Sequence, residues 1–201
     1  MLDIRKSLAA PAVYKLFAGI ISTRSSRWEL VDDYIRPEKG DRILDIGCGL
    51  AAILDFLPDI EYIGFDMEKR YIDAAIKRHG SRGQFYNLRI DHVTTEQFSS
   101  MDIALAKGVL HHLHDEEALQ LFTLARNALK ADGRLITMDG CHIPGRSHLE
   151  RCILAKDRGR HIRNQEDYYH LATRVFPKVQ VHLRHNLLRI PYTHIIMECS
   201  L

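Results

Sequence analysis

A glycine-containing turn is the strongest candidate for a ligand-binding element in this sequence. An apolar run with one carboxylate, Asp45, leads directly into the turn, which consists of Gly47, Cys48 and Gly49. Glycine lets a backbone pass close to a ligand and adopt a positive φ, and free amides at such a turn attract electronegative groups. A second carboxylate, Asp66, follows about 20 residues later, where it could accept both hydroxyls of an adenosine ribose. These residues predict a nucleoside-binding site.

Two classes of cofactor use a turn of this kind. The stretch from Gly47 to Ala52 satisfies the relaxed dinucleotide pattern G-x-G-x-x-A, which also uses an acidic residue at this distance. Asp45 lies inside the apolar run, where a dinucleotide site normally has an apolar residue and a ligand with an ammonium group favours an anion. The pattern therefore favours a nucleoside that carries an amino acid, and an NAD-dependent oxidoreductase stays open as the alternative.

Three segments resemble, in order, the motifs of class I S-adenosylmethionine-dependent methyltransferases, which have a Rossmann-like fold. Leu44 to Gly49 resembles their first motif, and Gly64 to Met67 resembles the end of their second strand. Met101 to Leu113 resembles their fourth strand and the following turn. The resemblance covers Arg42 to Asp139, and the terminal hairpin is similar to the family's sixth and seventh strands. A non-catalytic binding protein of the same fold would carry the same motifs.

The resemblance implies S-adenosylmethionine as the cofactor. Asp45 would lie near the methionine ammonium, the glycine turn would line the methionine portion, and a strand-end backbone would approach the ammonium from the other side. Asp66 would bind the ribose and Met67 would pack on adenine. The candidate cofactor-binding residues are Asp45, Gly47, Cys48, Gly49, Asp66, Met67, Lys107 and Gly108.

Two positions depart from the family pattern. Ala51 stands where a further glycine often occurs, two residues after Gly49. The acidic residue usual after the third strand is not clearly placed, because Arg89 occupies that turn and Asp91 follows later. The resemblance therefore assigns no residue to the adenine amino group.

Histidines after the predicted fourth strand are candidates for proton transfer. His111, His112 and His114 lie where ligands of open α/β sheets bind, at the carboxyl edge of the sheet. A neutral imidazole can accept a proton from a hydroxyl or amine near pH 7, so His111 or His112 is a candidate base or else shapes the pocket. Asp139 could face the same cleft or cap its loop. No metal site is predicted, because adjacent histidines point to different sides and lack further ligands at a familiar spacing.

The segment from Gly140 to Arg163 has a strongly positive local balance. Its charged residues are Arg146, Arg151, Lys156, Arg158, Arg160 and Arg163 against Glu150 and Asp157. A basic patch beside an active site would bind the phosphate or carboxylate of an anionic substrate, and a solvated basic surface is the alternative. The prediction is a methyltransferase that acts on oxygen or nitrogen of a small molecule, with this segment on the substrate side.

Composition limits the other partners. A formal net charge of +2 and a pI near 8.3 disfavour a dedicated nucleic-acid binder. The sequence has no apolar run of about 18 residues and no pattern of a secretion signal, so we expect no membrane partner and a cytoplasmic location. Cysteines 48, 141, 152 and 199 lie far apart without a C-x-x-C pair and are expected to be reduced thiols. The oligomeric state stays unassigned.

Strands and helices alternate through the middle of the chain. The predicted strands are Arg42 to Ile46, Glu61 to Phe65, Gln84 to Leu88, Ile103 to Ala106 and Arg134 to Met138. The predicted helices between them are Leu50 to Leu57, Glu68 to His79 and Glu116 to Leu129. Strands that recur between helices are typical of crossover units and of a parallel sheet.

The two ends of the chain complete one predicted domain. Amphipathic stretches at Ala10 to Ile21 and Ser25 to Ile35 predict leading helices. A helical stretch at Gln165 to Phe176 precedes strands at Lys178 to Leu183 and Thr193 to Cys199, whose short link allows only an antiparallel pair. We therefore expect an α/β three-layer sandwich with a seven-stranded, mainly parallel sheet whose last strand is antiparallel. Its parts are a helical cap (1–40), a cofactor-binding core (41–139), a substrate-side insertion and helix (140–176) and a terminal β-hairpin (177–201).

Overall fold

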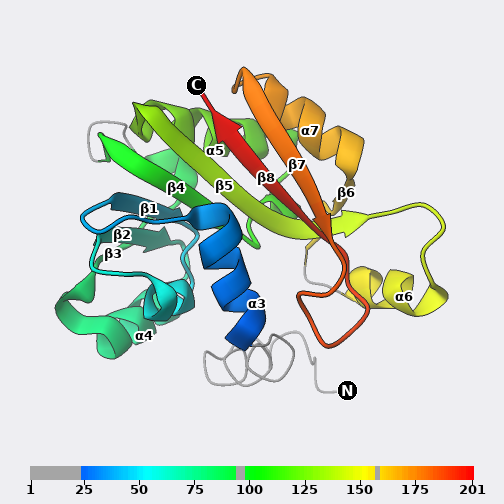
Figure 1. The fold of residues 1–201 in the computed structure, drawn as a ribbon, viewed down its shortest axis with the longest axis horizontal. Coiled ribbons are helices and arrows are strands. Elements are labelled where there is room, and N and C mark those ends of the chain that lie inside the picture. Colours follow the sequence, from blue (N-terminus) through cyan, green and yellow to red (C-terminus); the bar gives the residue numbers. More distant parts are fainter. Residues whose placement is uncertain (1–23, 94–97, 157–158) are drawn as a thin grey trace.

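One twisted sheet organises the molecule. The computed structural model describes residues 24–93, 98–156 and 159–201 of the chain. Seven strands follow the order β3-β2-β1-β4-β5-β8-β7, and a short eighth strand pairs with the end of β5 (Figure 1). The strands are β1 (Arg42–Ile46), β2 (Glu61–Asp66), β3 (Gln84–Asn87), β4 (Met101–Lys107), β5 (Leu129–His142), β6 (Arg163–Asn164), β7 (Lys178–Arg184) and β8 (His194–Ser200).

Strand directions confirm the predicted topology. Strands β1 to β5 pair in parallel, whereas β8 runs antiparallel to both of its neighbours, β5 and β7. The sheet has one strand more than the seven predicted, because β6 pairs in parallel with the end of β5. A strand of two residues carries no periodicity, so the sequence pattern could not indicate it.

Helices cover both faces of the sheet. The α-helices are α3 (Arg24–Glu29), α4 (Lys69–His79), α5 (Asp115–Ala128), α6 (His148–Lys156) and α7 (Gln165–Thr173). One turn of π-helix, η1 (Leu30–Ile35), continues α3, and the 3₁₀ turns are η2 (Ala52–Phe56), η3 (Gly80–Arg82), η4 (Ile90–His92) and η5 (Leu110–His112). None of the helices in the described ranges is long and apolar enough to cross a membrane.

Two hydrophobic clusters lie on opposite sides of the sheet. On one side, residues of η1, η2 and α4 pack against Ile43, Ile103 and Ile136. On the other side, α5 and α7 pack against Leu44 and Ala104. In Figure 1, α3 lies in front of the sheet, α5 lies behind it, and α6 lies beyond the carboxyl end of β5. Because adjacent residues of one strand alternate between the clusters, the sheet is the middle of three layers, as predicted.

The predicted helix from Leu50 to Leu57 is wrong. The structure has only the short 3₁₀ helix η2 (Ala52–Phe56) in this segment. Ala51 adopts a left-handed conformation with φ 48°, which α-helical hydrogen bonding cannot pass through, and Pro58 stops the segment soon afterwards. The glycine turn is therefore followed by an irregular connection instead of the start of an α-helix.

Strand β5 is much longer than predicted. It spans Leu129–His142 instead of Arg134 to Met138, so Asp139 lies within the strand and not at its exit. At the amino-terminal side, the predicted helix from Ser25 to Ile35 forms α3 and η1. The predicted helix from Ala10 to Ile21 lies outside the described residues.

Candidate active site

Asp45 is a buried carboxylate near the end of β1. Its side chain accepts a hydrogen bond at 2.5 Å from the hydroxyl of Tyr62, which lies on the neighbouring strand and the same face of the sheet. Its other oxygen, Oδ1, has no hydrogen-bond partner within the described part of the chain. Burial raises the pKa of Asp45, while the ammonium of Lys107 and the Tyr62 hydrogen bond act in the opposite direction. A buried carboxylate with an unpartnered oxygen fits a cationic ligand group.

Lys107 and Gly108 end the adjacent strand, β4. Burial lowers the pKa of the Lys107 ammonium, and the Asp45 carboxylate opposes this shift. Gly108 has φ 68°, and its amide donates to the Met138 carbonyl of β5 at 2.8 Å. Strands β1 and β4 pair in parallel, so both predicted segments reach the same edge of the sheet.

Backbone geometry shapes the glycine turn. Gly47 has φ 70°, and a Cβ at this position would lie 2.6 Å from Cγ2 of Val109. Gly49 also has a positive φ, 53°. The amide of Cys48 donates to the Phe65 carbonyl at 2.9 Å, which ties the turn to β2. The turn is thus held against both neighbouring strands, and a side chain on residue 47 would meet the segment after β4.

Asp66 joins the glycine turn to the start of α4. Its Oδ2 accepts the amide of Gly49 at 3.0 Å, and its Oδ1 accepts the amide of Glu68 at 2.8 Å. Burial raises its pKa, and these two hydrogen bonds act against the shift. Each carboxylate oxygen can accept more than one hydrogen bond, so these contacts leave acceptor capacity for ribose hydroxyls.

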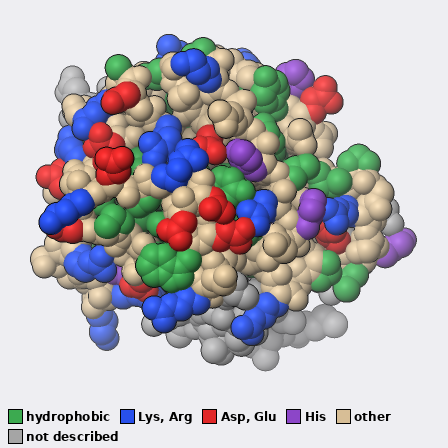
Figure 2. Space-filling model, viewed as in Figure 1, with side chains coloured by type: hydrophobic (Ala, Val, Ile, Leu, Met, Phe, Trp, Pro, Cys, Tyr) green, Lys and Arg blue, Asp and Glu red, His purple; other side chains and the backbone are tan. Residues whose placement is uncertain are grey.

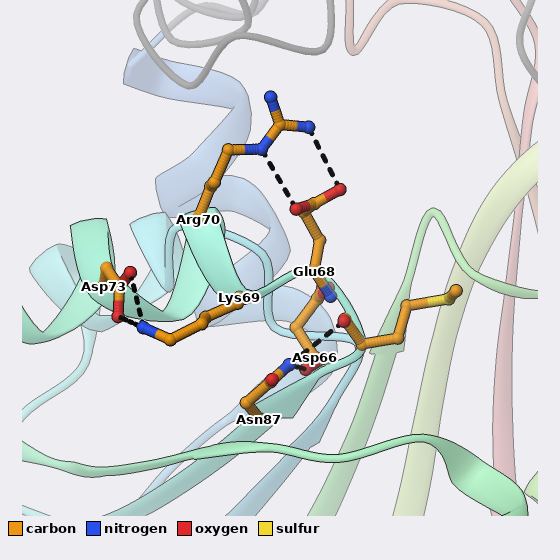
Figure 3. Close-up of polar contacts among 7 residues, drawn as sticks. Asp66, Glu68, Lys69, Arg70, Asp73 and Asn87 are labelled. Carbon is orange, nitrogen blue, oxygen red and sulfur yellow. Dashed lines mark hydrogen bonds and ion pairs between the residues drawn. The ribbon is translucent and has the colours of Figure 1, made fainter.

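Asn87 fixes the chain beyond Asp66. It is the register partner of Asp66 on β3, and its Nδ2 donates to the carbonyls of Asp66 and Met67 at 3.0 Å each (Figure 3). Met67 is 67% exposed. Glu68 pairs with Arg70 at the start of α4, projecting away from Asn87 in Figure 3.

The turn after β3 offers no isolated acidic group. Arg89 and Asp91 pair with each other at 3.1 Å on the surface. This pairing lowers the pKa of the Asp91 carboxyl and keeps it ionised. Residues 88–93, the described part of this turn, therefore add no residue for the adenine amino group beyond those that the sequence left open.

His111 and Asp139 form a buried pair at the carboxyl ends of β4 and β5. Nδ1 of His111 lies 2.7 Å from Oδ1 of Asp139, and the backbone amide of His111 donates to the same oxygen at 3.2 Å. Burial raises the pKa of Asp139, whereas its contacts with His111 act in the opposite direction. The carboxylate favours the tautomer with the proton on Nδ1, which leaves Nε2 of His111 as the basic nitrogen.

His112 and His114 are placed differently from His111. The His112 side chain is exposed, with its ring centre 4.2 Å from that of His111. His114 is the N-cap of α5 and exchanges capping-box contacts with Glu117. The described residues contain no group of three or more His, Cys, Asp and Glu that could hold a metal ion.

The basic residues of the insertion whose side chains the structure describes, Arg146, Arg160 and Arg163, have different surroundings. Arg163 is buried at 8% exposure and donates to the Asp115 carboxylate and to backbone carbonyls, so it is not part of an exposed basic surface. Arg146 contacts His185 and the buried Glu150. Arg160 is exposed. Arg158 lies outside the described residues, as do the side chains of Arg151 and Lys156.

A small cavity lies beside α6 and the end of β5. Its volume is about 260 Å³, and its walls include Ile143, Pro144 and Leu154 together with Arg146 and Glu150. The Glu150 carboxylate accepts a hydrogen bond from the hydroxyl of Thr193. On the face shown in Figure 2, cationic side chains are interspersed with acidic ones. This cavity therefore combines apolar walls with paired charges.

The sequence reasoning missed the contacts of four structural residues. They are Tyr62, Asn87, Arg163 and Tyr168, whose hydroxyl donates to the Gly140 carbonyl at 3.1 Å. Each partner is distant in sequence or reached through sheet register, so no local motif indicates these contacts. One of these residues, Asn87, had an available signal, because it is a polar residue that pairs with Asp66 on a predicted neighbouring strand.

A known family is similar to the part of the chain from β1 to β5, which carries the glycine turn and the histidine turn. Residues 44–135 match the family model of a methyltransferase domain. The chain is 25% identical over 155 residues to phosphoethanolamine N-methyltransferase of Triticum aestivum, a match that covers 75% of this chain and 30% of that protein. It is 31% identical over 127 residues to a tRNA (carboxymethyluridine(34)-5-O)-methyltransferase of Xenopus tropicalis, covering 59% of this chain and 19% of that protein. The chain thus spans less than a third of these curated relatives.

Solved structures show the same fold. A TehB-like S-adenosylmethionine-dependent methyltransferase of Corynebacterium glutamicum matches with a TM-score of 0.67 and 18% identity, covering 98% of this chain and 97% of the other. Phosphoethanolamine N-methyltransferase 2 of Haemonchus contortus, in complex with S-adenosyl-L-methionine, matches with a TM-score of 0.75 and 13% identity. That match covers 98% of this chain and 59% of the other. Residues 44–135 of this chain are therefore similar to a methyltransferase domain, and the chain has the Rossmann-like fold of these S-adenosylmethionine-dependent methyltransferases.

Proposed function

We propose that this chain transfers a methyl group from S-adenosylmethionine to a nitrogen of a small anionic amine. The observation that carries the cofactor assignment is the buried Asp45 carboxylate, with Oδ1 unpartnered among the described residues and the glycine turn beside it. S-adenosylmethionine supplies an ammonium group for such an anion and a methyl group on a sulfonium. Asp66 would hold the ribose, and Met67 would pack on adenine.

The backbone of the glycine turn argues against the dinucleotide alternative. A pyrophosphate site needs free amides at the start of an α-helix. Here the amides of Cys48 and Gly49 already donate to the Phe65 carbonyl and the Asp66 carboxylate. The next helical element is only the 3₁₀ turn η2. The turn therefore presents close backbone to a ligand without the anion-binding helix end that NAD requires.

His111 is the proposed base and Asp139 its positioning partner. The acceptor nitrogen would form a bond to the methyl carbon as the carbon–sulfur bond breaks, which leaves a neutral thioether. The proton lost by the nitrogen would pass to Nε2 of His111, while the 2.7 Å contact from Nδ1 to Asp139 stabilises the resulting imidazolium. Alignment of the nucleophile and exclusion of water would supply much of the remaining rate enhancement.

The choice of a small anionic amine rests on the curated relatives and on the insertion. Two relatives are named as phosphoethanolamine N-methyltransferases, at 25% identity each. The exposed Arg160 and the partly exposed Arg146 lie in the insertion, and a cation there would attract a phosphate or carboxylate. An RNA acceptor has the support of the tRNA methyltransferase relative, and it belongs in the same test.

Isothermal titration tests the cofactor assignment. We expect S-adenosylmethionine and S-adenosylhomocysteine to bind and NAD not to bind. The variant Asp45→Asn should lose most of the affinity, while Asp73→Asn, which changes an exposed carboxylate on α4, should keep it. Tight binding of NAD without a response to the other two ligands would refute the proposal.

A methyl-transfer assay with labelled donor tests the acceptor. The panel contains phosphoethanolamine, ethanolamine as the matched amine without the anion, and bulk tRNA. We expect labelling of phosphoethanolamine and weak labelling of ethanolamine. Labelling of tRNA alone would show that the acceptor is an RNA and not a small amine. Equal labelling of both amines would show that the anionic group does not contribute to recognition.

A further inference from the structure

Residues 159–163, here called the clamp, contact the histidine turn from the insertion side. The amide of His161 donates to the carbonyl of His111 at 2.9 Å. Gly159 lies so close to the His111 ring that a Cβ at residue 159 would overlap its Cδ2. On the neighbouring edge of the ring, a Cβ at Gly108 would lie 3.6 Å from Cε1. Glycine backbone therefore flanks the two ring carbons next to Nε2.

Arg163 connects the clamp to both ends of the turn. Its Nη1 donates to the carbonyls of Leu110 and His161 at 3.0 and 3.1 Å. Its Nη2 donates to the carbonyl of Leu113 at 2.7 Å and to Oδ1 of Asp115 at 2.7 Å. The planar guanidinium can address these partners together, whereas a lysine ammonium on its flexible stem cannot reproduce the fork.

Two separate devices thus hold His111. Asp139 fixes Nδ1 from β5. The clamp fixes the backbone of the histidine and packs against the opposite edge of its ring. Because Asp139 is in the cofactor-side core and the clamp follows α6, the ring is oriented jointly by the two sides of the cleft.

We propose that the clamp positions the His111 ring for methyl transfer, with Arg163 and Gly159 as positioning residues. The inference rests on the proposed function, because it concerns the orientation of the proposed base. A displacement of about 1 Å at a reacting group can cost about 100-fold in rate, so contacts that do not touch substrate can control kcat.

Two variants perturb the clamp independently. Arg163→Lys keeps the positive charge but removes the fork, and Gly159→Ala keeps Arg163 but pushes a methyl group against the ring. Each should lower kcat by about tenfold while the Kd for S-adenosylhomocysteine stays within about twofold. The ring resonance of His111, assigned with His111→Gln, should move in the NMR spectrum of both variants at fixed pH.

Arg126→Met is the matched control. Arg126 also donates to a backbone carbonyl, that of Val175, but contacts no residue of the histidine turn through this bond. It should leave kcat and the His111 resonance unchanged, and thermal unfolding checks that every variant is folded at the assay temperature. A purely structural Arg163 would lower the melting temperature without moving kcat or the resonance.

The results distinguish this inference from the proposed function. If the unmodified chain neither binds S-adenosylhomocysteine nor transfers methyl groups, the proposed function fails, and the ring resonance alone still reports whether the clamp orients His111. If the unmodified chain is active and both folded clamp variants keep its kcat and its His111 resonance, the clamp inference is overturned.

Discussion

The proposed donor side and the proposed acceptor side of the site are built by different means. On the donor side, backbone amides make many of the connections, as those of Gly49 and Glu68 do to the Asp66 carboxylate. On the acceptor side, side chains make the connections, as in Arg163 on the histidine turn and Thr193 on Glu150. The family model matches residues 44–135, which include the histidine turn, and ends within β5, before the positions of Glu150, Arg163 and Thr193.

This difference explains what each side can tolerate. A site made of backbone depends on a few positions where a Cβ or the loss of a carboxylate is decisive. A site made of buried polar side chains depends on networks whose members must all be partnered. We therefore expect donor-side changes to alter cofactor affinity and acceptor-side changes to alter stability or turnover.

Loss of the Asp45 charge should give the largest effect. Asp45→Asn keeps the shape of the side chain but removes the anion expected to face the ammonium. Breaking a buried charge pair costs about 2 to 5 kcal/mol, so the Kd for S-adenosylhomocysteine should rise about 100-fold. Titration calorimetry measures this, and an unchanged Kd would mean that the donor side does not hold an ammonium at Asp45.

Glu150→Ala should have the next largest effect, and it tests whether the acceptor side is independent of the donor side. Its carboxylate is buried and accepts from the Thr193 hydroxyl, so its removal takes away one of the two contacts of that buried hydroxyl, the other being with Nδ1 of His185. The free energy of unfolding should fall by about 2 kcal/mol, measured by urea denaturation. Binding of S-adenosylhomocysteine should stay within about twofold. A comparable loss of cofactor affinity would show that the two sides are not independent.

Gly47→Ala tests whether the backbone of the turn itself is decisive. Its φ of 70° strains any side chain, and the added Cβ would lie 2.6 Å from Val109. Gly80→Ala is the control, because Gly80 has φ 55° and a Cβ added there would meet nothing within 4 Å. Both variants place a side chain at a positive φ, which at Gly80 is combined with ψ −123°, but only Gly47→Ala should weaken S-adenosylhomocysteine binding, by about tenfold. If both variants bound S-adenosylhomocysteine equally well, the glycine turn would not be part of the cofactor site.

The sequence predicted the donor side better than the acceptor side for a physical reason. Asp45, the glycine turn and Asp66 lie at strand ends, and parallel strands bring their carboxyl ends to one edge whatever the rest of the chain does. The helix expected after the turn failed because Ala51 takes a left-handed conformation that no local propensity indicates. Side-chain identity alone also gave Arg163 a surface role, whereas the β5–β6 pairing buries it.

The pH dependence of binding should give the smallest effect. Burial raises the pKa of both Asp45 and Asp66 above the usual aspartate value, so each carboxyl takes up a proton at a higher pH than a surface aspartate. S-adenosylhomocysteine needs the ionised forms, and its Kd should rise by about threefold between about pH 7 and about pH 5. Titration calorimetry at the two pH values measures this rise.

Folding stability should respond to the same two groups in the opposite direction. A raised folded-state pKa means that the folded chain binds these protons more tightly than the unfolded chain does. The contribution of Asp45 and Asp66 to stability is therefore present at low pH and is lost as pH rises through their raised pKa values. Asp45→Asn should remove the Asp45 part of this trend. If the affinity for S-adenosylhomocysteine and these contributions to stability both increased with pH, Asp45 and Asp66 would not be the buried, ionisable groups of the donor side.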